Sequence, residues 1–451
     1  MNIFPKNKKI HFIGIGGISM SGIAKYFLTN GYKVSGSERK SSAVTTKLKN
    51  LGAKIYIGHK KENLVGADVV VYTSAVSDEN PELKEARKRK IKVLKRSEVL
   101  GLILKRFNKS VGITGCHGKT TATAMLTHLL CESGTDAAAF IGGDDLSFGN
   151  YKSGKDICVA EACEYKKNFL DLNPTISVIL NIDCDHMESY GSFENLLSAF
   201  KQFSQSEYSV INADDENCVK IINDNTVTFG IRNFADYTAR NVTEKEKGYS
   251  FTAFKRGKRL GNVTLSVKGY HNVYNALAAI AAADVLGVNV NTESLQNFKG
   301  VARRQEFLGL INNVTSFADY AHHPTEITET LKAFNVSDND LVVFQPHTYS
   351  RTRLLAEEFL ESLKGVKNLL IYKTYPAREK FDIDGDAFTL YKKLKTVNSE
   401  VKFAADFKEL SEKVKFYSEK KEKLKRIIIL GAGDVYYDAK KIIGENTCQS
   451  R

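Results

Sequence analysis

The amino-acid sequence predicts an α/β protein with three domains, each built on a largely parallel β-sheet. Apolar strand-like stretches alternate with amphipathic helical stretches along the chain. Several of these strand-like stretches end in glycines that precede a helix, which is typical of doubly wound α/β folds. The chain has 451 residues, too many for one hydrophobic core, so more than one domain is expected.

The first series of elements predicts a Rossmann-like domain over residues 1–107. KIHFIGIG (9–16) has the pattern of a buried parallel strand that ends in glycines, and ISMSGIAKYFLTNG (18–31) has helical spacing and stops at a glycine. Further strand-like stretches follow before the pattern pauses near residue 107: YKVSGSE, AKIYIG and ADVVVYTSAV.

Two more α/β series predict a central domain over residues 108–299 and a Rossmann-like C-terminal domain over 300–451. The central series contains the strand-like SVGITG, DICVAEA, ISVILNI and YSVINAD, an apolar helix in residues 267–287, and a β-hairpin in residues 245–267. The last series contains VTSFADYA, DLVVFQPH, NLLIYKTY, VKFAAD and RIIILGAG, with helices between them.

Composition narrows the function classes. The net charge is +13, but the lysines are spread along the chain and no nucleic-acid-binding motif appears, so a small anionic substrate is expected rather than DNA or RNA. The seven cysteines form no Cys-x-x-Cys pair, which favours a reducing compartment. Because no signal peptide or membrane-spanning run is evident, we expect a cytoplasmic protein without membrane insertion.

The stretch VGITGCHGKTTATAM (111–125) nearly matches a phosphate-binding P-loop. Ile113 stands where the pattern requires glycine, and the glycines fall at 112, 115 and 118. The strand–turn–helix context still presents backbone N–H groups and a helix dipole to an anion. Lys119 would reach β- and γ-phosphate oxygens, and the Thr120 hydroxyl would bind Mg²⁺. The alternative, a chance glycine turn, leaves the Gly-Lys-Thr-Thr run unexplained.

Acidic residues and a histidine follow two later apolar strands. Glu161 ends one strand, and Asp183, Asp185 and His186 follow another. Strand ends of an open parallel sheet line one crevice, where carboxylates could hold Mg²⁺ beside a triphosphate. Imidazole is an unusual Mg²⁺ ligand, so a solvated strand end and a structural histidine remain alternatives.

Further candidates occur in the second half of the chain. Asn272 and Asn275 share one helical face, and could hold a nucleotide or simply pack. Arg303 and Arg304 suit phosphate oxygens, although an exposed basic pair is the alternative.

Two strand ends of the last series also carry polar groups. Asp319, Tyr320, His322 and His323 follow the first, and His347 and Arg351 follow the second. Arg351 could clamp a carboxylate with two hydrogen bonds. A zinc site from the three histidines lacks the expected ligand spacing.

The glycine loop GIGGISMSG fits the dinucleotide fingerprint only partly, because Ser19 stands where that fingerprint has glycine. It could still cradle a diphosphate, with Glu38 on a ribose or base. The glycine turn ILGAGDVYY near the C-terminus is similarly weak. Without hydride-handling residues, a nicotinamide oxidoreductase is not favoured.

Taken in order, these stretches closely resemble the Mur ligase family of bacterial peptidoglycan synthesis. In that family the short loop is written Gly-x-x-Gly-x-x-Gly-Lys-Thr/Ser, as at Gly112 to Thr120. The resemblance extends over nearly the whole chain and is carried by HFIGIGGISMSGIA, YTSAVSDENPE, NIDCDHM, HNVYNALAA, DYAHHPTEI and FQPHTYSRT.

The resemblance implies a first domain for the UDP part of the substrate, a central domain for ATP, and a third for the amino acid. It implies Mg²⁺ ligation by Thr120, Glu161 and His186, and catalytic roles for Lys119, Glu161, His186, His322 and Arg351. The implied ATP-binding residues are Gly115, Cys116, His117, Gly118, Lys119, Thr120, Thr121, Asn272, Asn275, Arg304 and Asp319. Those for the UDP-sugar are Gly14, Gly16, Gly17, Ser37 and Ser74.

The resemblance is greatest to members that join L-alanine to UDP-N-acetylmuramate through an acyl phosphate. A peptide-recycling member, which joins a murein peptide instead, is the alternative. The chain is expected to be a monomer or a weak homodimer. It departs from the family pattern at Ser19, at Cys116 in place of threonine, at Gln305 in place of an aromatic residue, and at Thr348 in place of an arginine of some members.

Overall fold

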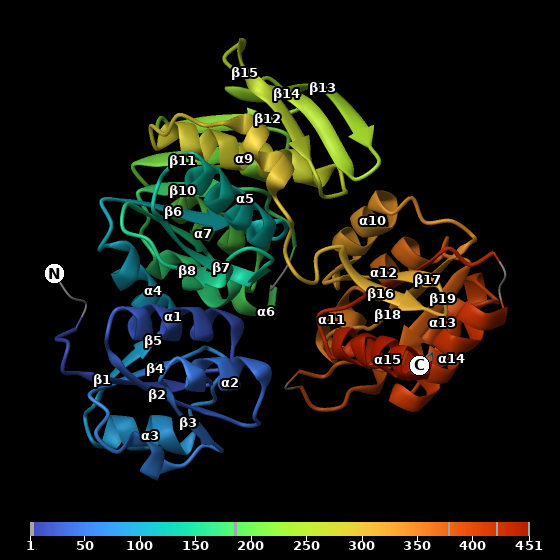
Figure 1. Cartoon of the computed structure of the whole chain (residues 1–451), viewed down its shortest axis with the longest axis horizontal. Coiled ribbons are helices and arrows are strands. Elements are labelled where there is room, and N and C mark those ends of the chain that lie inside the picture. The colour runs from blue at the N-terminus through green and yellow to red at the C-terminus, as the bar shows by residue number, and fades with distance from the viewer. Residues whose placement is uncertain (1–3, 185–186, 378, 421–422, 450–451) are drawn as a thin grey trace. The chain divides into compact units, whose positions relative to one another are not determined.

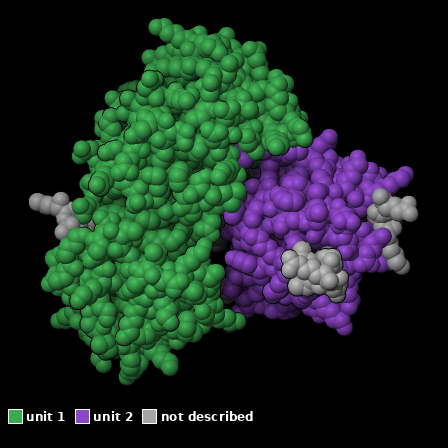
Figure 2. Space-filling view, in the orientation of Figure 1, with its two compact units in different colours: residues 1–266, 271–299 green, residues 267–270, 300–451 purple. Residues whose placement is uncertain are grey.

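The computed structural model describes residues 4–184, 187–377, 379–420 and 423–449. These residues form three β-sheets covered by helices (Figure 1). The chain divides into two compact units, coloured separately in Figure 2: unit 1 has residues 1–266 and 271–299, and unit 2 has residues 267–270 and 300–451. The predicted fold class, three α/β parts with largely parallel sheets, is confirmed.

The first sheet has five parallel strands in the order β3-β2-β1-β4-β5. The strand order reverses between β1 and β4, where parallel sheets of this kind form a ligand crevice. The strands are β1 (Lys9–Ile13), β2 (Lys33–Glu38), β3 (Lys54–Ile57), β4 (Val69–Tyr72) and β5 (Lys92–Lys95). The helices are α1 (Ile18–Thr29), α2 (Ala43–Asn50), η1 (Lys61–Leu64), α3 (Pro81–Lys88) and α4 (Arg96–Leu104).

The second sheet has ten strands in the order β15-β14-β13-β12-β11-β10-β6-β9-β7-β8. Its strands run from β12 to β7 in parallel, whereas β13, β14 and β15 pair antiparallel at one end and β7 and β8 at the other. The predicted hairpin is therefore part of a three-stranded extension.

The elements of this second sheet have the following bounds. The strands are β6 (Lys109–Thr114), β7 (Ala137–Asp145), β8 (Gly149–Lys152), β9 (Ile157–Glu161), β10 (Ile176–Ile179), β11 (Tyr208–Asn212), β12 (Thr226–Gly230), β13 (Tyr237–Lys245), β14 (Gly248–Lys255) and β15 (Lys258–Leu265). The helices are α5 (Lys119–Glu132), η2 (Tyr165–Asp171), α6 (Met187–Tyr190), α7 (Phe193–Phe203), α8 (Glu216–Val219), α9 (His271–Val285) and η3 (Thr292–Asn297).

The third sheet forms unit 2, with six strands in the order β16-β17-β21-β18-β19-β20, parallel except for β16. The strands are β16 (Glu306–Ile311), β17 (Val314–Asp319), β18 (Asp340–Phe344), β19 (Asn368–Tyr372), β20 (Lys402–Ala404) and β21 (Arg426–Leu430). The helices are α10 (Pro324–Ala333), α11 (Tyr349–Leu354), α12 (Ala356–Leu363), η4 (Ile383–Gly385), α13 (Ala387–Val397), α14 (Phe407–Lys420) and α15 (Val435–Gln449). In the described part of the chain, no helix is long and apolar enough to span a bilayer.

The first two sheets share one hydrophobic core. Phe27 of α1, Phe140 of β7 and Phe169 of η2 belong to the same buried cluster. Polar contacts reinforce this junction, because the Asn150 amide donates to the Ser21 hydroxyl at 2.8 Å. The domain boundary predicted at residue 107 falls between α4 and β6, inside unit 1. The assignment of separate roles to residues 1–107 and 108–299 stays a prediction.

Gly101 of α4 marks the tightest point of this junction. A Cβ at this position would lie 2.0 Å from the Asp171 carbonyl oxygen. We expect Gly101→Ala to destabilise the protein by about 1–3 kcal/mol, because the backbone of η2 must move to admit a methyl group. The midpoint of urea unfolding measures this change.

Gly444→Ala is the matched control, because Gly444 lies in α15 and its Cβ would meet no atom within 4 Å. This control should be neutral or stabilising by up to about 1 kcal/mol. Equal unfolding midpoints for Gly101→Ala and the unchanged protein would contradict the close packing of α4 on η2.

Candidate active site

The turn between β6 and α5 has the backbone of a phosphate-binding loop. Gly115 and Gly118 have φ angles of 138° and 84°, and Gly118 caps the N-terminus of α5. A Cβ on Gly118 would lie 2.5 Å from the Asn275 Oδ1 atom, so the turn needs glycine both for its conformation and for this close approach. Ile113 lies within β6 and is fully buried, which accounts for the residue that departs from the P-loop pattern.

The ammonium of Lys119 is held inside this loop. Its Nζ atom donates to the carbonyl oxygens of Gly115 at 2.6 Å and Cys116 at 3.1 Å, and lies 3.0 Å from the Glu164 Oε1 atom. Burial lowers the pKa of Lys119, but the Glu164 carboxylate together with Cys163, Glu161 and Cys116 outweighs burial, and the net shift is upward. Lys119 therefore stays charged at neutral pH.

Glu164 was not singled out from the sequence. It lies three residues beyond Glu161, and its side chain is almost completely buried. The only available signal was its place in VAEACEYKK, one turn past the end of an apolar strand, and that placement does not reveal that it meets the lysine.

Cys116 anchors the loop to the segment after β10. Its thiol donates to the Asp183 carbonyl oxygen at 3.2 Å, and the Asp183 N–H donates to the sulfur at 3.1 Å. A threonine hydroxyl has the same capacity to donate and accept. The departure at Cys116 thus keeps a contact between the loop and this segment, with sulfur in place of oxygen.

Asn181 makes three contacts with the same loop and was also missed from the sequence. Its Oδ1 atom accepts from the His117 N–H at 2.8 Å, and its Nδ2 atom donates to the His117 carbonyl at 3.0 Å. Its own carbonyl oxygen accepts from the Cys116 N–H at 3.3 Å. Asn181 therefore holds the backbone of both Cys116 and His117 in place.

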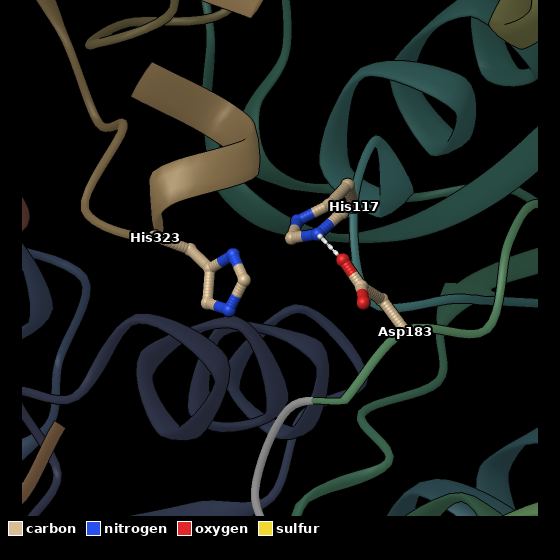
Figure 3. Close-up of side chains that lie close together, drawn as sticks. All are labelled: His117, Asp183 and His323. Atoms are coloured by element: carbon tan, nitrogen blue, oxygen red, sulfur yellow. Dashed lines mark hydrogen bonds and ion pairs between the residues drawn. The ribbon is translucent and has the colours of Figure 1, made fainter. Parts of the chain in front are cut away.

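His117 and Asp183 form a pair at the outer side of this loop. Figure 3 shows the imidazole directed at the carboxylate, with 3.3 Å between His117 Nε2 and Asp183 Oδ2. Both side chains are partly exposed. The pair connects the loop to the end of β10 by a second side-chain contact.

Thr120 and Glu161, two of the three predicted Mg²⁺ ligands, lie side by side. The Thr120 hydroxyl donates to the Glu161 Oε2 atom at 2.7 Å, and the Gly142 N–H donates to the same oxygen at 3.1 Å. A side chain at Gly142 would overlap the Glu161 carboxylate, since a Cβ would lie 2.2 Å from Oε2. The third predicted ligand, His186, and Asp185 lie outside the described residues.

The predicted asparagine pair lies beside the loop, at the start of α9. Both side chains are buried, and Asn275 Nδ2 donates to Asn272 Oδ1 at 2.9 Å. Asn275 is the residue that closely approaches Gly118. The structure thus brings Asn272 and Asn275 together with Gly115, Cys116, His117, Gly118, Lys119, Thr120 and Thr121.

The glycine loop of the first sheet is held by β2. The N–H groups of Gly14 and Ile15 donate to the Ser37 carbonyl at 2.9 and 3.1 Å, and the Gly16 N–H donates to Glu38 Oε2 at 3.0 Å. Gly17 caps α1 without a side-chain hydrogen bond. Ser74 lies in the turn after β4, across the strand reversal from β1.

The hydroxyl of Ser37 is buried and faces two side chains of the same domain. It donates to Glu82 Oε2 at 2.5 Å and lies 2.9 Å from His59 Nδ1, and its side chain is fully buried. Burial raises the pKa of Glu82, but His11, whose Nε2 atom lies 3.7 Å from the carboxylate, and hydrogen bonds from Ser37 and Asn63 outweigh burial, and the net shift is downward. Ser37 supports the loop through its carbonyl, and Ser19 accepts a hydrogen bond from Arg96 at 2.8 Å.

In unit 2, Asp319 organises the turn that carries the arginine pair. Its buried carboxylate accepts from the N–H groups of Gln305 and Ala321, each at 2.9 Å. Burial raises the pKa of Asp319 although Arg304 opposes the shift. Arg303 donates to the carbonyls of Gly431 and Gly433. Arg304 is partly exposed, 3.9 Å from the Glu326 carboxylate.

His322 and Arg351 both approach His347 within unit 2. The rings of His322 and His347 lie 5.4 Å apart, and Arg351 Nη1 lies 3.4 Å from His347 Nδ1. Burial, together with the positive charge of His322, Arg351 and Arg303, lowers the pKa of His347 to about 3. His347 is therefore neutral at physiological pH.

His323 has a different role from His322. It caps the N-terminus of α10, where its Nδ1 atom accepts from the Thr325 N–H at 3.4 Å, and Figure 3 labels it. Within the part of unit 2 that the structure describes, His322, His323 and His347 do not gather as ligands of one metal ion. The zinc alternative raised by the sequence has no support there.

Comparisons with known proteins place the chain in one family. Family models match three consecutive parts: Mur ligase family, catalytic domain, over residues 9–108; Mur ligase middle domain over residues 113–283; and Mur ligase, glutamate ligase domain, over residues 303–433. A UDP-N-acetylmuramate–L-alanine ligase of Clostridium acetobutylicum is 41% identical over 444 residues, which cover 95% of this chain and 96% of that protein.

Solved structures agree with this placement. The crystal structure of a UDP-N-acetylmuramate–alanine ligase from Thermotoga maritima matches with a TM-score of 0.84 and 31% identity, covering 98% of this chain and 100% of that chain. A murein peptide ligase from Psychrobacter arcticus shares the fold with a TM-score of 0.73 and 22% identity, covering 97% of this chain and 98% of that chain.

The anchoring role of Cys116 predicts a contrast between two substitutions of similar size. Cys116→Thr keeps a donor and an acceptor for Asp183, so its affinity for ADP should stay within about twofold. Cys116→Val loses both hydrogen bonds, together worth about 2 kcal/mol, and should bind ADP more weakly by up to about thirtyfold. Isothermal titration calorimetry measures both affinities. Equal affinities of the two variants would show that the contact does not support the loop.

Proposed function

The chain belongs to the Mur ligase family, and we propose that it uses ATP to join L-alanine to UDP-N-acetylmuramate in peptidoglycan synthesis. The observation that carries this proposal is the near full-length similarity to L-alanine ligases. The loop geometry supports it, since the charged Lys119, the hydrogen-bonded pair Thr120 and Glu161, and helix N–H groups without a side-chain cap lie together at the start of α5.

The reaction has two steps. The lactyl carboxylate of UDP-N-acetylmuramate attacks the γ-phosphorus of ATP, which forms an acyl phosphate and releases ADP. The amine of L-alanine then attacks the acyl carbon, and inorganic phosphate leaves from the tetrahedral intermediate. Positioning and charge neutralisation supply most of the catalysis in such a transfer. Lys119 would neutralise charge on the β- and γ-phosphates, with the N–H groups of residues 118–120 beside it.

Thr120 and Glu161 fit a magnesium ion, because both offer oxygen ligands and these lie 2.7 Å apart. His186 would complete the protein ligands. When bound, Mg²⁺ supplies positive charge against the phosphate oxygens. Asn272, Asn275, Arg304 and Asp319 would complete the ATP site, with Asp319 acting through the turn that presents Arg304.

The two remaining substrates would be bound by other parts of the chain. Gly14, Gly16 and Gly17 would cradle the diphosphate of the UDP-sugar, with Ser37 holding the loop from below and Ser74 across the strand reversal. Arg351 would bind the alanine carboxylate, and His322 would take a proton from the alanine ammonium. The protein would act in the cytoplasm, where ATP and nucleotide sugars are found. It would be a monomer or a weak homodimer.

The first test measures ADP release with UDP-N-acetylmuramate, Mg²⁺ and a panel of acceptors. L-alanine should give turnover, whereas a murein tripeptide should not. Lys119→Ala should lower kcat by at least about 10³-fold, because it removes a charge that acts on the transferred phosphate, while UDP-N-acetylmuramate still binds. Absence of ADP release by folded protein with L-alanine would refute the proposed function. Preference for the tripeptide would identify a recycling ligase instead.

The second test addresses the metal site. Thr120→Ser keeps the hydroxyl and should need the same Mg²⁺ concentration for half-maximal activity. Thr120→Val removes a ligand and should raise that concentration by roughly tenfold, as loss of one metal-site contact does. Mg²⁺ titrations of the rate of ADP release measure this concentration for both variants. An unchanged Mg²⁺ requirement in Thr120→Val would exclude Thr120 as a ligand.

A further inference from the structure

The P-loop lysine is already paired with an anion of its own chain. The side chain of Glu164 is 1% exposed and that of Lys119 is 14% exposed, with 3.0 Å between Oε1 and Nζ. Among the described residues, the other two acceptors of the ammonium are carbonyl oxygens of the loop itself. The ammonium is thus directed at protein groups, and Glu164 is the charged one among these three.

The backbone around Glu164 is fixed in an unusual conformation. Two nearby residues, Lys166 and Lys167, have φ angles of 53° and 59°. Such left-handed conformations cost residues other than glycine about 1–2 kcal/mol each. The Glu164 carbonyl accepts from the Lys167 N–H at 2.9 Å and from the Tyr190 hydroxyl at 2.5 Å. Phe169, further along the same turn, stacks on Phe203 in the core. The fold therefore tolerates local strain to keep Glu164 in place.

A phosphate and a carboxylate cannot share Lys119 without cost. Both are anions, and the lysine lies in a site where little water screens their mutual repulsion. Moving the ammonium from Glu164 to a phosphate keeps it paired throughout, which avoids an unpaired buried charge. A nucleotide phosphate that binds Lys119 must therefore replace the existing ion pair between Lys119 and Glu164.

We propose that Glu164 is a positioning residue that holds the Lys119 ammonium between turnovers and competes with the nucleotide phosphates for it. The inference rests on the ATP site of the proposed function. Its consequence is a lower affinity for nucleotide than the loop alone would give. Glu164 takes the ammonium back as ADP leaves, which speeds product release.

The test compares ADP binding by the full-length protein and its Glu164→Gln variant in the presence of Mg²⁺. Glutamine keeps the size of the side chain and removes its charge. We expect Glu164→Gln to bind ADP roughly tenfold more tightly in calorimetry. Release of a fluorescent ADP analogue should slow by a similar factor in stopped-flow measurements. A purely structural role for Glu164 predicts weaker binding instead.

Asp340→Asn provides a matched control. Asp340 is fully buried and pairs with Arg426 at 2.7 Å, but it lies in unit 2 at the start of β18. Its neutralisation should lower the unfolding midpoint without raising ADP affinity. A rise in ADP affinity in Asp340→Asn equal to that in Glu164→Gln would overturn the proposal, because the effect would then not depend on Lys119.

The remaining outcomes are also decisive. Unchanged or weaker ADP binding by folded Glu164→Gln overturns the proposal. If Glu164→Gln does not fold, Glu164→Asp is measured in its place, because the shorter side chain weakens the contact with Lys119. Tighter ADP binding by Glu164→Asp than by the unchanged protein supports the proposal. Equal or weaker binding overturns it. Failure of the unchanged protein to bind ADP would refute the proposed function itself, which separates the two conclusions.

Discussion

The burial of one ammonium group, that of Lys119, sets requirements on the residues around it. A buried charge must be paired and hydrogen-bonded, and here two loop carbonyls and the Glu164 carboxylate meet that need. The loop carbonyls can face inward only because Gly115 and Gly118 adopt left-handed conformations. Asn181 and Cys116 then tie the outer side of the same turn to β10. The positions of these residues all follow from the need to hold the Lys119 ammonium in the loop after β6.

The sequence predicted the elements of this site better than their contacts. Strand–glycine–helix patterns located the loops after β1, β6 and β21, because local spacing encodes them. Glu164 and Asn181 were missed because their roles come from partners far away in the chain, 45 and 64 residues distant. The implied UDP-sugar role of Ser37 stays a prediction; its hydroxyl faces Glu82 and His59, a direction that alternation along a strand does not specify.

Strand β7 shows a similar limit at the level of secondary structure. Its sequence, AAAFIGGDD, is rich in alanine and glycine, which are uncommon in strands. Tertiary context overrides that preference. The small residues allow close packing beside β9, and Gly142 in particular leaves room for the Glu161 carboxylate. The predicted three-part architecture was correct, but the core shared by the first two sheets depends on pairings such as Tyr26 with Phe140 that no local pattern reveals.

The thiol of Cys116 has a consequence for chemical selectivity. It satisfies the hydrogen bonds that a threonine hydroxyl would make, so the fold accepts either atom at this position. Sulfur, unlike a hydroxyl, reacts readily with electrophiles once it is deprotonated. Cys116 is only 6% exposed, so the folded loop shields this sulfur, and opening of the loop would expose it to such reagents. A residue that matches threonine in its hydrogen bonds thus differs from it in reactivity, in the loop that we propose binds phosphate.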